Sequence, residues 1–117
     1  MTQEEKQLLL IDLCSRLPYG VIMTNKKLKD TYYPLDGNEL QQAYYDDDWD
    51  DVPYLRSMSS MTDEEKNELG RISCEGNIVH KYGIFYRSQD YLNSIHVDYR
   101  GLIPKGLAIE APEGMYE

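Results

Sequence analysis

The sequence has no long hydrophobic run, and this absence bears on where the protein works. Its longest aliphatic run, Leu8–Ile11, is four residues long, whereas a membrane-spanning helix needs about 20 apolar residues. The first residues are acidic, and no hydrophobic region ends in a small-residue cleavage site of the kind that signal peptides carry. We therefore expect a cytoplasmic protein without a membrane-spanning segment.

Cysteine and histidine are scarce, with two of each in 117 residues. A structural zinc site needs four ligands, and the chain has neither a Cys-x-x-Cys pair nor paired histidines. Two separate cysteines in a chain without export signals favour free thiols over a disulfide. No recognisable nucleophile or cofactor motif accompanies them, so we predict no metal site, no cofactor and no enzymatic activity.

Basic residues are missing from the middle of the chain, between positions 30 and 52. The same stretch holds eight of the acidic residues, namely Asp30, Asp36, Glu39, Asp46, Asp47, Asp48, Asp50 and Asp51. A negative patch of this kind repels phosphate backbones, whereas nucleic-acid binding draws on clustered lysine and arginine. The composition therefore argues against direct DNA or RNA binding.

Part of this acidic stretch resembles the start of a calcium-binding loop. Asp46, Asp48 and Asp50 alternate as the first three ligands of such a loop do. The rest of the template fails, because Asp51 stands where glycine is needed and Ser57 where a bidentate glutamate is needed. A solvated acidic loop is the favoured interpretation, and a weak, adventitious cation site is the alternative.

The composition of the sequence is sufficient for one hydrophobic core. It is 41% hydrophobic and 28% charged, with eleven tyrosines, which is too apolar for a disordered chain. The length is near the commonest domain size. We expect a single α+β domain over 1–117, in which an N-terminal helix and a helix in the C-terminal half, from Ser88, pack on a small antiparallel sheet, with a short lid helix near Thr62.

Two capping boxes predict where helices begin. Thr2 and Glu5 form the first, and that helix should end at Pro18. On a helical wheel Leu9 and Leu13 share the apolar side, whereas Asp12 and Arg16 fall away from it. A second box, Thr62 with Glu65, predicts a short lid helix that ends near Gly70 or Ile72.

The remaining elements are predicted from turn residues and from the spacing of apolar side chains. Segments 19–24, 28–33 and 40–45 are typical of three short strands in an antiparallel meander. Segment 78–87 is predicted to be extended. A further helix should begin at the cap Ser88, continue through Tyr99, and stop at Gly101.

Aromatic and acidic residues adjoin one another after the third predicted strand. We expect them to form an exposed tip, because burying so many charges would cost several kcal/mol. Aromatic anchors ringed by charge suit a protein partner that presents basic residues. The predicted contact residues are Tyr44, Tyr45, Asp46, Asp47, Asp48 and Trp49.

The sequence also suggests two alternatives to protein binding. An acidic protein can mimic DNA and occupy a DNA-binding enzyme, but mimicry needs charges spread along a surface rather than crowded into one stretch. Alternatively, a small-molecule binder or enzyme could use a pocket at the end of the last helix. Its candidate residues are His96, Asp98, Tyr99 and Arg100.

The same segment has a structural interpretation, which we favour. Asp98 and Arg100 can serve as local hydrogen-bond partners that fix a chain reversal, and Gly101 allows the positive φ angle that a reversal requires.

Three blocks of the sequence resemble a known family. They are LPYGV at 17–21, PYLRSMSSMT at 53–62, and DYRGLI at 98–103 with GLAIEAPEGMY at 106–116. They resemble small, uncharacterised proteins of Bacteroides-type gut bacteria, their prophages and their phages. The blocks span nearly one third of the chain, and the resemblance brings no activity, cofactor or catalytic residue with it. It implies an accessory protein of phage or mobile-element type that binds another protein.

Overall fold

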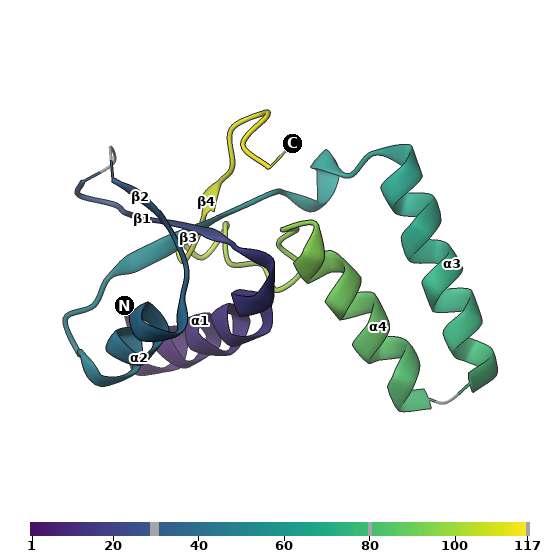
Figure 1. The fold of residues 1–117 in the computed structure, drawn as a ribbon, viewed down its shortest axis with the longest axis horizontal. Helices are drawn as coiled ribbons and strands as arrows, with labels where there is room; N and C mark the ends of the chain where they lie inside the picture. Colours follow the sequence, from purple (N-terminus) through teal and green to yellow (C-terminus); the bar gives the residue numbers. More distant parts are fainter. Residues whose placement is uncertain (29–30, 80, 117) are drawn as a thin grey trace.

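The chain folds into a four-stranded mixed sheet with helices on one face and a helical hairpin at one side, which is the α+β class that the sequence predicts (Figure 1). The computed structural model describes residues 1–28, 31–79 and 81–116, and for 75–79 and 81–86 it describes the backbone alone. The elements in chain order are α1 (Gln3–Arg16), the 3-10 turn η1 (Leu17–Tyr19), β1 (Ile22–Asn25), β2 (Tyr32–Pro34), α2 (Gly37–Tyr45), β3 (Asp51–Leu55), the 3-10 turn η2 (Met58–Ser60), α3 (Asp63–Val79), α4 (Lys81–Ser94) and β4 (Ile109–Glu110).

The sheet has the strand order β2-β1-β3-β4. β1 lies antiparallel to both β2 and β3, with Thr24 paired to Tyr32 on one side and to Val52 on the other. β4 runs parallel to β3, so the prediction of a purely antiparallel sheet is wrong at this edge. Parallel neighbours need a long crossover connection, and the chain supplies it through α3 and α4 between the two strands.

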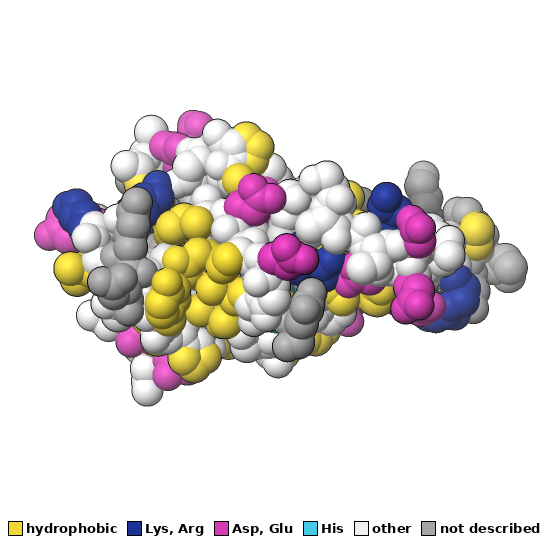
Figure 2. All heavy atoms as spheres, turned by 90° about the horizontal axis from the view of Figure 1, so that it is seen from above, with side chains coloured by type: hydrophobic (Ala, Val, Ile, Leu, Met, Phe, Trp, Pro, Cys, Tyr) yellow, Lys and Arg dark blue, Asp and Glu magenta, His cyan; other side chains and the backbone are white. Residues whose placement is uncertain are grey.

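The two faces of the sheet differ. Helices α1 and α2 cover one face, and the core between them includes Leu9, Met23, Ala43 and Leu55 (Figure 1). Seen from above, hydrophobic side chains gather over the sheet on the side away from these helices (Figure 2). The rings of Tyr32 and Tyr54 lie on this second face, with their centroids 5.7 Å apart.

The helices α3 and α4 pack against each other and project from one side of the sheet (Figure 1). A second apolar cluster of Met61, Leu92 and Val97 lies where this hairpin meets the rest of the chain. The radius of gyration is 14.9 Å, against roughly 13 Å for a compact chain of this length. The projecting hairpin accounts for the difference, because it lengthens the molecule to 45 Å along one axis.

Both predicted capping boxes are confirmed. The Thr2 hydroxyl accepts from the Glu5 amide at 3.1 Å, and the Glu5 carboxylate accepts from the Thr2 amide at 2.9 Å. Thr62 and Glu65 make the same pair of hydrogen bonds at 3.1 and 2.9 Å. Each box satisfies two backbone donors that a helix start leaves free.

The predicted strand at 40–45 is wrong, because these residues belong to helix α2. The turn residues before them act as a helix cap, since the Asp36 carboxylate accepts from the Glu39 amide at 2.8 Å. Leu40 and Ala43 then stand three residues apart on the side of the helix that meets the core. A helical period explains this burial better than the weak alternation of a strand.

The prediction of an extended segment at 78–87 is also wrong. Helix α3 runs to Val79 and α4 begins at Lys81, while His80 lies outside the described residues. α3 is therefore longer than the predicted lid helix, and α4 begins before Ser88 and ends at Ser94. Packing of the two helices on each other stabilises both, which local propensity alone does not reveal.

Strand β3 lies inside the sheet, yet the sequence pattern does not predict it. It follows directly on the acidic run, and Pro53 occupies its middle. Proline has no N–H to donate to a neighbouring strand, so its presence argues against an interior strand. Pairing with β1 on one side and β4 on the other nevertheless defines the strand, and Val52 and Leu55 within it are fully buried.

Candidate functional site

The last turn of α2 exposes two tyrosines beside three aspartates. The side chains of Tyr44 and Tyr45 are 67% and 73% exposed. Their rings meet edge to face, with centroids 5.0 Å apart and planes at 88°. Asp46, Asp47 and Asp48 follow directly and are exposed. We call these five residues the acidic–aromatic surface.

Trp49 does not belong to this surface, so its prediction as an exposed contact residue is wrong. It is only 8% exposed and packs in the main core with Leu9 and Ala43. The chain turns back immediately after the aspartates, because the Trp49 amide donates to the Asp46 carbonyl at 3.2 Å. This turn directs the large indole inward, where its burial stabilises the junction between α2 and β3.

Part of the acidic stretch is used inside the fold. Asn25 donates to the carboxylates of Asp50 and Asp51 at 2.8 and 2.7 Å, and the Tyr33 hydroxyl donates to Asp51. Burial, and then the hydrogen bond to Asp51, raise the pKa of Tyr33 well above its usual range. The Lys27 ammonium lies 3.9 Å from the Asp50 carboxylate. Asp46–Asp48 is the run of consecutive exposed carboxylates in this stretch, and Asp36 is exposed as well.

One lysine lies close to the acidic–aromatic surface. Lys6 donates to the carbonyl of Asp46 at 2.8 Å, and its nitrogen lies 4.0 Å from a carboxylate oxygen of Asp47. The Asp47 side chain is fully exposed, so water screens this long ion pair. Three carboxylates beside one ammonium leave the surface negative.

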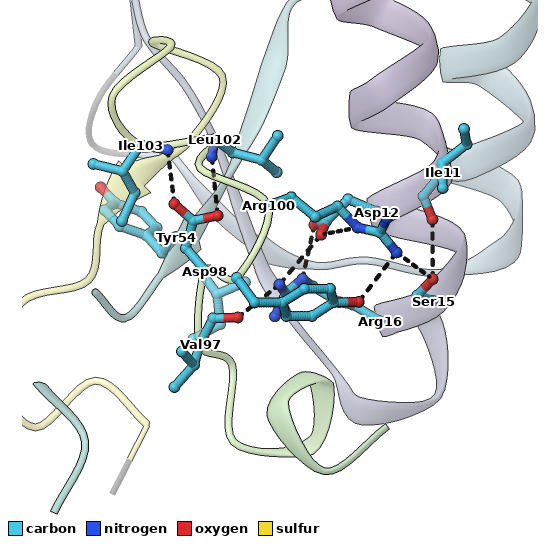
Figure 3. Close-up of polar contacts among 12 residues, drawn as sticks. Ile11, Asp12, Ser15, Arg16, Tyr54, Val97, Asp98, Arg100, Leu102 and Ile103 are labelled. Carbon is cyan, nitrogen blue, oxygen red and sulfur yellow. Dashed lines mark hydrogen bonds and ion pairs between the residues drawn. The ribbon is translucent and has the colours of Figure 1, made fainter. Parts of the chain in front are cut away.

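The segment from His96 to Arg100 does not converge on one pocket. The buried carboxylate of Asp98 accepts from the backbone amides of Leu102 and Ile103 at 2.9 and 3.0 Å (Figure 3). Gly101 has a φ angle of 74° at the reversal. The structural role favoured for Asp98 is thus confirmed.

The prediction that Arg100 also fixes the reversal is wrong, because its side chain points toward helix α1 (Figure 3). Its Nε lies 3.1 Å from the Asp12 carboxylate, and its guanidinium lies 5.0 Å from the centre of the Tyr99 ring. Arg16 donates to the same carboxylate at 2.7 Å and to the Val97 carbonyl at 2.8 Å (Figure 3). These contacts join α1 to the segment after α4.

Asp12 and Arg16 have no solvent exposure at all. The helical wheel placed them away from the apolar side, so the sequence analysis missed this buried ion pair. Their i, i+4 spacing was the available signal, but the same spacing is common on solvated helix faces.

His96 faces the C-terminal segment. Its backbone has a φ angle of 62°, which is uncommon for a residue other than glycine. Its ring stacks on that of Tyr116, with centroids 3.8 Å apart and planes at 16°. Burial lowers the pKa of His96 to about 4, so the imidazole is neutral at pH 7.

A hollow lies beside the C-terminal segment. It has a volume of about 590 Å³ and opens between the start of α3 and residues 110–116. We call it the C-terminal cleft. Its lining consists of Arg56, Ser57, Ser60, Thr62, Glu65, Glu110, Ala111, Pro112, Glu113, Gly114 and Tyr116. None of the four candidate pocket residues is among them.

The described residues hold no group of three or more histidine, cysteine or acidic side chains placed to bind a metal ion. Cys14 and Cys74 are free thiols, as the sequence predicts. Within the described part of the chain, every helix is too short or too polar to cross a membrane.

Comparison of the sequence with protein-family models and with curated proteins, and of the chain with solved structures, finds no match. The functional argument therefore depends on the chain's own residues.

Proposed function

We propose that this chain is a non-enzymatic, protein-binding accessory protein of the cytoplasm, and that the acidic–aromatic surface contacts a partner with basic residues. The observation that carries the proposal is the exposed edge-to-face pair of Tyr44 and Tyr45 beside three exposed aspartates. Aromatic side chains are enriched at protein interfaces, where they provide much of the binding energy.

The position of the aspartates supports this proposal. The C-terminal end of a helix carries partial negative charge, so cations stabilise it and anions destabilise it. Helix α2 has no basic residue in its last turn, and Asp46–Asp48 follow that turn. Lys6 compensates only part of this charge. An arrangement that weakens the free protein but favours a positively charged partner is typical of a binding surface.

The two alternatives have less support. A DNA mimic needs a long row of carboxylates, whereas the exposed run at the end of α2 is three residues long. A pocket built by His96–Arg100 would require these side chains to share a cavity, whereas Asp98, Arg100 and His96 face three different segments. We therefore propose neither. The phage or mobile-element setting remains an expectation from the resemblance.

The test compares variants in affinity capture from a lysate of the natural host. The captured partner is identified and purified, and its binding is then titrated. Tyr44→Ala with Tyr45→Ala should weaken binding by at least about 30-fold, because truncated aromatic anchors cost about 2 kcal/mol or more. Leu28→Ala with Met58→Ala is the matched control, since both side chains are exposed and apolar and lie elsewhere.

The charges are tested separately. Asp46→Asn, Asp47→Asn and Asp48→Asn together should slow association and reduce its dependence on salt. Neutralising Glu4, Asp63 and Glu64 removes the same amount of charge from other exposed positions and should change binding less. Equal losses in both triple variants would show that only the total charge matters, and the proposed surface would be wrong.

A further inference from the structure

The C-terminal cleft has the size and form of a ligand site, and it lies apart from the acidic–aromatic surface. Binding sites commonly have volumes of about 300–1,000 Å³, and this cleft has about 590 Å³. Hydroxyl groups of Ser57, Ser60 and Thr62 line one side, and the C-terminal segment forms the other. Helix α2 lies on the opposite side of the sheet from this segment (Figure 1).

The basic side chain of the cleft is held by the protein itself. The Arg56 guanidinium donates to both carboxylate oxygens of Glu65 at 2.7 Å and to the carbonyls of Ser60 and Ile95 at 3.0 and 3.2 Å. The hydrogen bond from Arg56 lowers the pKa of Glu65 to about 2, so the pair stays charged near neutral pH. An anionic ligand would have to break these contacts, because Arg56 is the one basic side chain in the described lining.

The opposite wall carries negative charge that the fold does not use. Glu110 and Glu113 line the cleft and are exposed. Neither carboxylate has an ion-pair partner among the described residues. This wall therefore favours a cation.

Tyr116 adds an aromatic surface to the same wall. Its hydroxyl accepts from the Ile22 amide at 2.9 Å and donates to the Tyr54 carbonyl at 2.7 Å, which fixes the ring. His96 covers one face of the ring, and Tyr116 is among the residues that line the cleft. Because His96 is neutral at pH 7, it does not repel a cation that approaches the tyrosine.

We propose that the C-terminal cleft binds the cationic side chain of a lysine or arginine in a peptide segment, between Glu110, Glu113 and the ring of Tyr116. Two carboxylates and an aromatic ring supply charge and cation–π contacts. On the facing wall, Ser57 and Ser60 already hydrogen-bond within the protein, whereas the Thr62 hydroxyl accepts from the Glu65 amide and can still donate to a peptide carbonyl. This site is independent of the proposed function, because it shares no residue with the acidic–aromatic surface.

Titration of the ¹⁵N-labelled full-length chain with capped tripeptides tests the proposal by NMR. Acetyl-Gly-Arg-Gly-amide and its lysine counterpart should shift the amides of residues 56–62 and 110–116 saturably. The citrulline peptide has nearly the same shape without the charge, so it should bind at least about 10-fold more weakly. Equal binding of the citrulline peptide, saturable shifts confined to other residues, or no saturable shift with any peptide would overturn the proposal.

Spermidine distinguishes a peptide side chain from a free amine. We expect it to bind more weakly than the arginine peptide, because it cannot form hydrogen bonds like those of a peptide backbone. Tighter binding of spermidine would overturn the assignment to a peptide.

Substitutions in the chain test whether Glu110 and Glu113 contact the cationic side chain of the peptide. Glu110→Gln with Glu113→Gln should weaken the arginine peptide by about 5- to 10-fold, in line with two partly exposed charge pairs. The control Glu4→Gln with Asp47→Asn removes equal charge elsewhere and should bind like the wild type, as should Tyr44→Ala with Tyr45→Ala. A glutamine variant that binds like the wild type would overturn the proposal and leave the acidic–aromatic surface unaffected.

Discussion

At the scale of single residues, Asp12 joins helix α1 to the segment after α4. Its carboxylate accepts from Arg16 on its own helix and from Arg100 after α4, and Arg16 in turn reaches the Val97 carbonyl. Both members of the α1 pair are fully buried. A buried charge that loses its partner is strongly destabilising, whereas an apolar replacement of both partners is tolerated better.

We therefore expect Asp12→Ala to lower the free energy of unfolding by about 3–5 kcal/mol, because it leaves the Arg16 guanidinium buried without a counter-charge. Urea denaturation measures the loss. Asp12→Leu with Arg16→Met should recover much of it, and Glu4→Ala on the exposed side of the same helix should change stability by less than about 0.5 kcal/mol. An Asp12→Ala loss below about 1 kcal/mol would contradict the buried pair.

Glu65 gives a prediction with a defined pH range. Its hydrogen bond from Arg56 lowers the pKa in the folded chain from the usual 4.5 to about 2. Glu65→Gln should lose about 2 kcal/mol near neutral pH, the typical contribution of hydrogen bonds to a charged group. As the pH falls from about 4.5 to 2, the unfolded chain takes up the proton first, so the difference between wild type and variant should shrink.

Denaturant titrations of the two proteins between neutral pH and pH 2 measure this difference, with Glu64→Gln as a control at an exposed neighbour. A difference that stays constant over the whole range would argue against the charged Arg56–Glu65 pair.

Several residue roles were predictable because they depend on a few neighbouring positions. The two capping boxes and the Asp98–Gly101 reversal are of this kind, and all are confirmed. The burial of Trp49 and of Asp12 was not predictable in this way, because it depends on elements that come together only in the folded chain.

At the scale of elements, α2 shows that packing on the core decides between helix and strand. The residues before it, Asp36 and Gly37, are equally typical of a hairpin turn and of a helix start. The Asp36 carboxylate bonds to the Glu39 amide, and Ala43 is then buried against the core. Local sequence leaves the choice open, and packing on the core decides it.

We expect Asp36→Ala to cost about 1 kcal/mol, the usual contribution of a helix N-cap. Asp36→Asn keeps a side-chain acceptor and should cost less. Asp47→Ala is the control, because Asp47 is exposed beyond the end of the helix. Thermal or urea unfolding of the three variants provides the measurement. If Asp36→Ala and Asp47→Ala had equal stability, Asp36 would not act as the cap.

The helical hairpin and β3 could not be predicted from local sequence patterns, because tertiary packing overrides local preference in both. The 78–87 segment is rich in residues that favour strands, yet α3 and α4 stabilise each other as helices along their contact. In β3, Pro53 argues against an interior strand, whereas burial of Val52 and Leu55 requires one.

At the scale of the whole molecule, the sheet separates two surfaces of different kinds. α1 and α2 cover one face, and α2 ends in the acidic–aromatic surface (Figure 1). The other face has hydrophobic side chains (Figure 2). The C-terminal cleft lies near β4, since Glu110 is one of its lining residues. The α+β class and the five residues of the first surface were predicted from the sequence, which also wrongly added Trp49 to that surface. Sequence analysis did not predict the cleft, which forms from segments more than 40 residues apart in the chain.

The most direct test of the central claim is site-specific photo-crosslinking in the natural host, with a benzophenone amino acid at Tyr45 and, as control, at Lys66 on exposed α3. The proposed function predicts one dominant crosslinked protein from position 45, joined near lysine or arginine residues of that protein, and its absence from position 66. Crosslinking of the same protein at position 66 but not at position 45 would contradict the acidic–aromatic surface as the binding site.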